Sequence, residues 1–117
     1  MFLQGTPKLR ASLKGAMLLS AFFHVFPAIA HDALPTSAMP QGWSYPLACC
    51  SGYDCREVSH SQIKEGPAGY VIASTGELIP MTDRKVKPSP DGEFHWCSVA
   101  GKDDGKTICL FVPPRAF

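Results

Sequence analysis

Short apolar segments recur through the second half of the chain, each only a few residues long and bounded by turn-forming residues. They cover residues 56–59, 69–73, 77–81, 93–99 and 107–112. Segments of this length between such breaks are typical of β-strands. Residues 74–76 can close one hairpin, and residues 89–92 place proline and glycine where a type I turn favours them. The pattern therefore predicts a small, mainly β domain built from antiparallel hairpins.

Two local features refine this prediction. Residues 59–65, which precede Gly66 and Pro67, form the one stretch after the N-terminal region that could make a turn or so of helix. The last hairpin is expected to turn at residues 102–105, with Gly105 in the left-handed conformation. In that register Cys97 faces Phe111 and Cys109 faces Val99. The two cysteines would then lie diagonally on the same face of the sheet.

The N-terminal 30 residues have the order of a secretory signal peptide. Cationic Lys8, Arg10 and Lys14 precede an apolar run at 16–26, and Ala28 and Ala30 occupy the two small positions of a cleavage site. The run is interrupted by polar residues and is shorter than the roughly 20 residues that a spanning helix needs. We expect cleavage after Ala30 and no stable membrane anchor afterwards. The alternatives are an uncleaved anchor or a buried helix.

The expected mature chain divides into two parts. Residues 31–41 contain two prolines and several small residues, which predicts a flexible leader, and residues 42–117 form the domain. All ten acidic residues but only eight of the 11 basic residues follow Ala30, so the mature charge is −2. Such a chain has no basic face for nucleic acid. The hydrophobic core of so small a domain gives only marginal stability by itself, which predicts additional cross-links.

Five cysteines follow the signal peptide: Cys49, Cys50, Cys55, Cys97 and Cys109. Export makes disulfides the expected state, and the odd number leaves one thiol free or available for a covalent dimer. Adjacent Cys49 and Cys50 are not expected to bond each other. The favoured scheme joins Cys97 and Cys109 to two of the three cysteines at 49–55. The alternative pairs Cys97 with Cys109 and forms a local bridge to Cys55.

Two metal sites are consistent with the residue types. Cys49, Cys50, Cys55, His95 and Cys97 include enough ligands for zinc, although the paired CxxC spacing of zinc sites is absent. Cleavage after Ala30 would make His31 the N-terminus, where amine and imidazole chelate copper together, and His60 or His95 would complete that site. The expected state is free of cofactor, and copper or zinc bound by His31, His60 and His95 is the alternative.

Catalytic signals are weak. Ser59, His60 and Ser61 supply a nucleophile and a base, but sequence neighbours seldom meet in triad geometry, and no GxSxG or CxxC motif accompanies them. Trp43, Tyr45, Tyr53, Phe94 and Trp96 would form either a binding surface for a sugar, peptide or protein, or simply the core. The prolines after Val112 indicate a capped edge strand. We assign no catalytic residue and expect a binding or structural module.

Four segments carry a resemblance that covers nearly the whole mature domain: WSYP at 43–46, CCSGYDCR at 49–56, SPDGEFHWC at 89–97 and CLFVPP at 109–114. In these segments the chain resembles small exported proteins of alphaproteobacteria, a group with no established activity. The resemblance implies a periplasmic or secreted location and transfers no site residues. Together with the composition, it leads us to expect a protein or cell-envelope component as partner.

Overall fold

The computed structural model describes residues 31–114 of the chain. The predicted signal peptide lies outside the described residues, as do residues 115–117. The described part is mainly β, as the sequence predicts, with nine strands and two short 3₁₀ helices. The strands are β1 Asp32–Ala33, β2 Trp43–Ser44, β3 Cys55–Val58, β4 Ile63–Gly66, β5 Gly69–Ile72, β6 Leu78–Ile79, β7 Val86–Pro88, β8 Phe94–Ser98 and β9 Thr107–Val112. The 3₁₀ helices are η1 His60–Gln62 and η2 Val99–Gly101. Within residues 31–114, no helix has the length and apolarity to cross a membrane.

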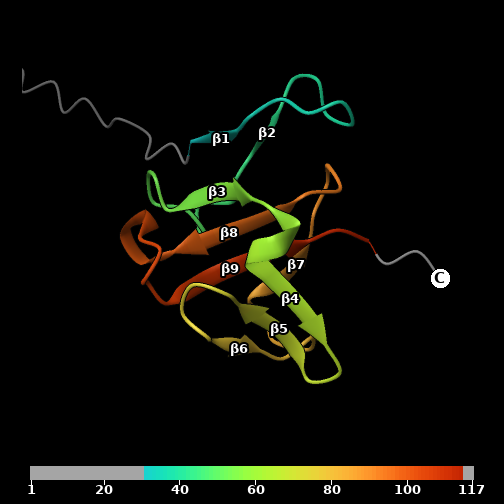
Figure 1. The fold of residues 1–117 in the computed structure, drawn as a ribbon. Coiled ribbons are helices and arrows are strands. Elements are labelled where there is room, and N and C mark those ends of the chain that lie inside the picture. The colour runs from blue at the N-terminus through green and yellow to red at the C-terminus, as the bar shows by residue number, and fades with distance from the viewer. Residues whose placement is uncertain (1–30, 115–117) are drawn as a thin grey trace, which may run out of the picture.

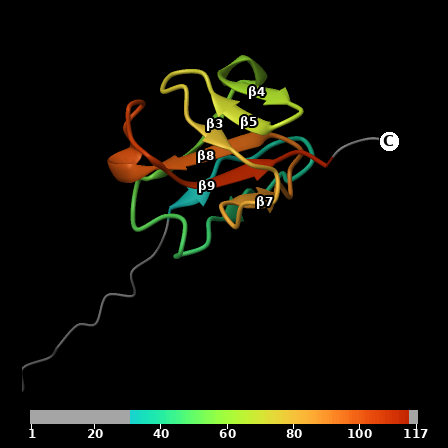
Figure 2. The same ribbon diagram turned by 90° about the horizontal axis from the view of Figure 1, so that it is seen from below.

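The strands form three layers, with a four-stranded sheet in the middle (Figure 1). The central sheet has the order β3-β8-β9-β7, the sheet β4-β5-β6 covers one face, and the β1-β2 hairpin lies on the other side. The same layering is seen from below in Figure 2. All strand pairs are antiparallel except β7 with β9, which is parallel. The prediction of antiparallel pairing therefore holds for every described pair but this one, although β3 and β8 are distant in sequence and do not form a hairpin.

The central sheet is buried on both faces because its inner strands are apolar at alternate positions on each side. One face builds a cysteine core of Ala33, Tyr45, Cys49, Cys50, Cys55, Cys97, Cys109 and Phe111. The other builds a second core of Val58, Ile63, Tyr70, Ile72, Ile79, Phe94, Trp96 and Leu110. Every residue of β8 is buried, so this strand is the centre of the molecule.

The helix predicted at 59–65 is only partly present. The 3₁₀ helix η1 ends at Gln62, and Ile63 already begins β4. The reason is the pairing of Ile63 with Ile72 on β5, which buries both side chains in the second core. Tertiary packing of a β-branched residue here outweighs the local turn propensity.

The register predicted for the last hairpin is wrong, because a β-bulge shifts the pairing of its two strands. Cys97 faces Cys109 directly, and His95 faces Phe111, because the pairing shifts between Cys97 and Ser98. Gly105 is not left-handed. The positive φ angles occur instead at Ala100 and Gly101 in η2, which lengthens the connection. The β-turn at residues 102–105 is present, with the Gly105 N–H donating to the Lys102 carbonyl at 3.0 Å.

The segment predicted as a flexible leader belongs in part to the domain. Ala33 is 4% exposed and packs in the cysteine core, and β1 pairs with β2. Gly42 is required in this hairpin because its φ is +69° and a Cβ there would lie 2.5 Å from the Ala33 carbonyl oxygen. The predicted edge position of the C-terminal strand is also wrong. β9 lies between β8 and β7, so β3 and β7 form the edges.

Candidate functional site

Three cysteines form a row across the central sheet. Cys55, Cys97 and Cys109 occupy paired positions on β3, β8 and β9, and their side chains belong to the cysteine core. Cys55 is bonded to Cys97, and Cys109 is bonded to Cys49 in the overlying loop. Both bridges follow the favoured pairing scheme. Their loops span 42 and 60 residues, and each bridge of this kind stabilises a small domain by about 2–4 kcal/mol.

The fifth cysteine, Cys50, has a free and buried thiol. Its Sγ lies 3.2 Å from Nδ1 of His31 and 3.2 Å from the carbonyl oxygen of Gly52. The His31 Nδ1 also contacts that carbonyl oxygen. The tight turn after Cys50, which the Asp54 carboxylate stabilises through the Ser51 N–H at 3.1 Å, brings the Gly52 carbonyl back over the thiol. A covalent dimer through Cys50 would require this loop to open.

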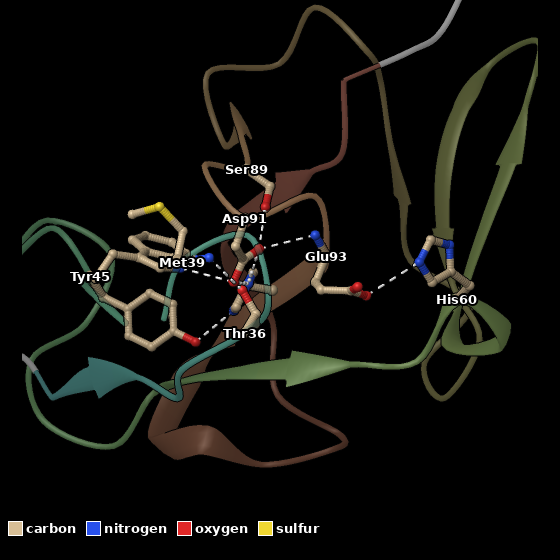
Figure 3. A network of polar contacts seen from close by, with 9 residues as sticks. Thr36, Met39, Tyr45, His60, Ser89, Asp91 and Glu93 are labelled. Carbon is tan, nitrogen blue, oxygen red and sulfur yellow. Dashed lines mark hydrogen bonds and ion pairs between the residues drawn. The ribbon is translucent and has the colours of Figure 1, made fainter. Parts of the chain in front are cut away.

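A buried polar chain crosses the cysteine-core face of the sheet. His95 on β8 is fully buried, and its Nδ1 lies 2.7 Å from the Tyr45 hydroxyl. Its Nε2 lies 2.9 Å from both carboxylate oxygens of Asp91. The indole N–H of Trp43 donates to Asp91 at 3.0 Å, and the Ser89 hydroxyl donates at 2.8 Å. Figure 3 shows Tyr45, Ser89 and Asp91 gathered in this network.

The hydrogen bonds of this buried network determine which of its side chains carry protons. Burial alone would raise the pKa of Asp91, but the hydrogen bonds from His95, Trp43, the Glu93 N–H and Ser89 lower this pKa to about 2. The ionised carboxylate accepts from Nε2 of His95, so in neutral His95 Nδ1 accepts from the Tyr45 hydroxyl. Burial and then the charge of Asp91 raise the pKa of Tyr45, which keeps that hydroxyl protonated.

A groove of about 480 Å³ lies between β1 and the outer edge of β3. Residues 31–34 form one wall, and Cys55 through Ser59 form the other. Tyr45 and Glu93 also line it. Three acidic residues line it, the exposed Asp32 and Glu57 and the half-buried Glu93. The Arg56 guanidinium lies 4.5 Å over the ring of Trp96, a residue of the second core, and pairs with Asp103 at 2.8 Å. The groove is therefore acidic.

The structure does not assemble the predicted metal ligands His31, His60 and His95. Both ring nitrogens of His95 are occupied by Tyr45 and Asp91. His60 lies on η1, where its Nε2 is 3.4 Å from the Glu93 carboxylate, as Figure 3 shows. Among residues 31–114, no three or more His, Cys, Asp or Glu side chains are placed to hold one ion. The alternative zinc cluster fails because Cys49, Cys55 and Cys97 are in disulfides.

The predicted aromatic surface is not present as one surface. Tyr45 and Trp96 are both 3% exposed and belong to opposite cores of the sheet. Trp43 packs edge-on against His95 and Phe111 at 4.9 and 5.1 Å between ring centroids. Tyr53 alone is exposed, at 87%, and stacks on His31. The aromatic residues therefore mainly form the cores.

Sequence reasoning missed the groove residues and the partners of His95. One available signal was a histidine within a strand that is apolar at neighbouring positions, since a buried imidazole requires polar partners. Asp91, in the turn just before that strand, was the nearest candidate.

Comparisons of the chain with models of protein families, with curated proteins and with solved structures find no match.

Proposed function

We propose that this protein is an exported binding module that takes an extended segment of a cell-envelope or secreted protein in the groove between β1 and β3. The observation that carries the proposal is an acidic groove along a sheet edge. β3 has β8 as its single paired neighbour among the described strands, and β1 pairs with β2 instead. An added strand would extend the central sheet, a common mode of peptide recognition.

The register shows which groups of β3 face the groove. The Ser98 N–H donates to the Asp54 carbonyl at 3.0 Å, and Arg56 lies opposite Trp96 two residues further along. Hydrogen-bonded and non-bonded positions alternate along an antiparallel pair. Arg56 therefore directs its main-chain groups toward β8, whereas Cys55 and Glu57 direct theirs toward the groove. A bound strand would find donors and acceptors there at every second residue.

Charge defines the chemistry of the partner segment. Asp32, Glu57 and Glu93 line the groove together with Arg56. The Arg56 guanidinium is already engaged, because it lies over the Trp96 ring and pairs with Asp103. The apolar side chain of Leu34 is 74% exposed at the same wall. We therefore propose a segment that alternates basic and apolar side chains, because one set would meet the carboxylates and the other Leu34.

Two findings support an exported setting. Two disulfides within one small domain are typical of proteins that mature in an oxidising compartment. The chain also begins with residues in the order of a signal peptide. We propose a periplasmic or secreted location, in line with the resemblance to exported alphaproteobacterial proteins. The open strand edge along the groove suits a bound peptide, and binding is therefore the role we propose.

The test is an NMR titration of the isotope-labelled chain from His31 onward with two short peptides. One alternates lysine and valine, and the other alternates glutamate and valine. The proposal requires amide shift changes at Asp32, Glu57 and neighbouring groove residues with the lysine peptide only. Glu57→Gln should weaken that binding by about two- to fivefold, the value of one exposed ion pair. The matched variant Asp104→Asn, at an exposed turn residue, should leave it unchanged.

Two outcomes would overturn the proposal. Shift changes outside the groove would show that the peptide binds elsewhere. Equal binding of both peptides would show that the carboxylates do not select the partner.

The copper or zinc alternative with His31, His60 and His95 as a set has no supporting geometry in the described residues. His31 has Cys50 as its neighbour, with Sγ 3.2 Å from Nδ1.

A further inference from the structure

Four atoms with ligand character converge at the beginning of the described chain. They come from the main-chain nitrogen and Nδ1 of His31, Sγ of Cys50 and the carbonyl oxygen of Gly52. The Gly52 oxygen is 3.4 Å from the His31 nitrogen and 3.2 Å from Sγ, which is itself 3.2 Å from Nδ1. A zinc ion with bonds of about 2.0 Å to nitrogen and 2.3 Å to sulfur separates its tetrahedral ligands by about 3.3–3.6 Å. These three separations are close to those values, whereas Nδ1 and the Gly52 oxygen are in direct hydrogen-bond contact and would have to move apart before both could bind the ion.

The orientation of His31 suits chelation. Its Nδ1, not Nε2, faces Cys50. Nδ1 is the ring nitrogen that can close a six-membered chelate with the amine of the same residue. That amine is free only when the peptide bond to Ala30 has been cut, at the position where the sequence predicts signal cleavage. The main-chain nitrogen therefore becomes a ligand through processing.

Neighbouring groups hold the two side chains in place. The Tyr45 ring meets the His31 imidazole edge-on with centroids 5.2 Å apart, and Tyr53 stacks on it at 5.9 Å. Cys50 is 1% exposed, and its neighbour Cys49 is fixed by the bridge to Cys109. The thiol is thus buried and directed at the imidazole. The imidazole and the thiol are therefore held side by side, and an ion would displace the hydrogen bond between Nδ1 and the Gly52 carbonyl.

We infer that the mature chain binds one d¹⁰ metal ion, Cu(I) or Zn(II), through the amine and Nδ1 of His31 and the thiolate of Cys50. The Gly52 carbonyl or a water occupies the fourth position. Thiolate and imidazole ligands suit both ions. On binding, Cys50 loses its S–H proton to solvent and Sγ forms the bond to the metal, with no change of oxidation state. Zn(II) and Cu(I) differ in affinity, which the experiment measures separately.

The experiment uses the chain that begins at His31, with both disulfides intact. Competition with a zinc chelator in one series and a Cu(I) chelator in the other gives the affinities, and native mass spectrometry gives the stoichiometry. We expect one equivalent of at least one ion, with submicromolar affinity. The matched control carries one additional glycine before His31, which converts the amine to an amide without touching the core. It should bind at least about tenfold more weakly.

The variant Cys50→Ser should bind at least about a hundredfold more weakly, because it removes the one anionic ligand of the site, whereas the added glycine removes a neutral amine. His60→Ala should leave the affinity unchanged. Unfolding midpoints of all variants separate a misfolded chain from a lost ligand. Metal should also slow alkylation of Cys50 in the parent chain. Affinities weaker than micromolar for both ions, insensitivity to the added glycine, or a natural mature chain starting elsewhere would each overturn the inference. None of these readouts depends on peptide binding in the groove.

Discussion

Asp91, in the turn before β8, and His95, on that strand, form a fully buried pair in which Nε2 lies 2.9 Å from each carboxylate oxygen. The pair belongs to a polar chain that links the turn at 89–92 to Trp43 and Tyr45, about fifty residues earlier. Because the described residues contain no buried side-chain nitrogen or oxygen without a partner, each member of this chain is satisfied. Asp91 is its centre.

Replacing Asp91 by alanine is expected to destabilise the domain by about 3 kcal/mol. The change removes the carboxylate that accepts from His95, Trp43 and Ser89, and it leaves those donors buried without a partner. Chemical denaturation with both disulfides intact measures the effect. Asp104→Ala, at an exposed position, should change the free energy of unfolding by less than about 0.5 kcal/mol. Similar values for the two variants would refute a central role for Asp91.

The same carboxyl group makes stability depend on acid. Its pKa is 3.8 when unperturbed and about 2 in the folded chain, so the folded state favours the ionised form. The resulting stabilisation, about 2 kcal/mol, is fully present above pH 4 and is lost as the pH falls through 2. Unfolding free energies measured from pH 5 to pH 2 should therefore fall more steeply in the parent chain than in Asp91→Asn. Parallel curves would contradict the assignment.

Strand positions were predictable where a strand contributes buried apolar side chains to a core. The predicted strand at 107–112 matches β9, and the one at 69–73 differs from β5 by a residue. β7 was not predictable from local pattern. Val86 is only half-buried, Pro88 ends the strand, and its partner β9 is distant in sequence. Its stability comes from a parallel pairing that no local periodicity encodes.

The site was less predictable because it depends on long-range contacts. Export and an odd cysteine count were sufficient to anticipate two bridges and one remaining thiol. The bulge between Cys97 and Ser98, which places Cys97 opposite Cys109, depends on the whole connection through η2. Likewise, the contact between His31 and Cys50 depends on how β1 docks over the loop, which the proline-rich composition of that segment conceals.

Two proline substitutions on β3 should distinguish its open edge, which faces the groove, from the edge that is hydrogen-bonded to β8. Glu57→Pro removes an N–H that faces the groove, and proline is tolerated where an edge strand has no ladder bond to lose. We expect this variant to remain folded but to bind the lysine peptide more weakly than Glu57→Gln does, because it loses the main-chain donor as well as the carboxylate. Arg56→Pro removes an N–H that faces β8, and it also removes the contact of the guanidinium with Trp96. It should destabilise the domain by at least about 1–3 kcal/mol. Thermal unfolding and the NMR titration together decide the matter. If Glu57→Pro unfolds the chain as Arg56→Pro does, the groove edge of β3 already has a main-chain partner and cannot receive a strand.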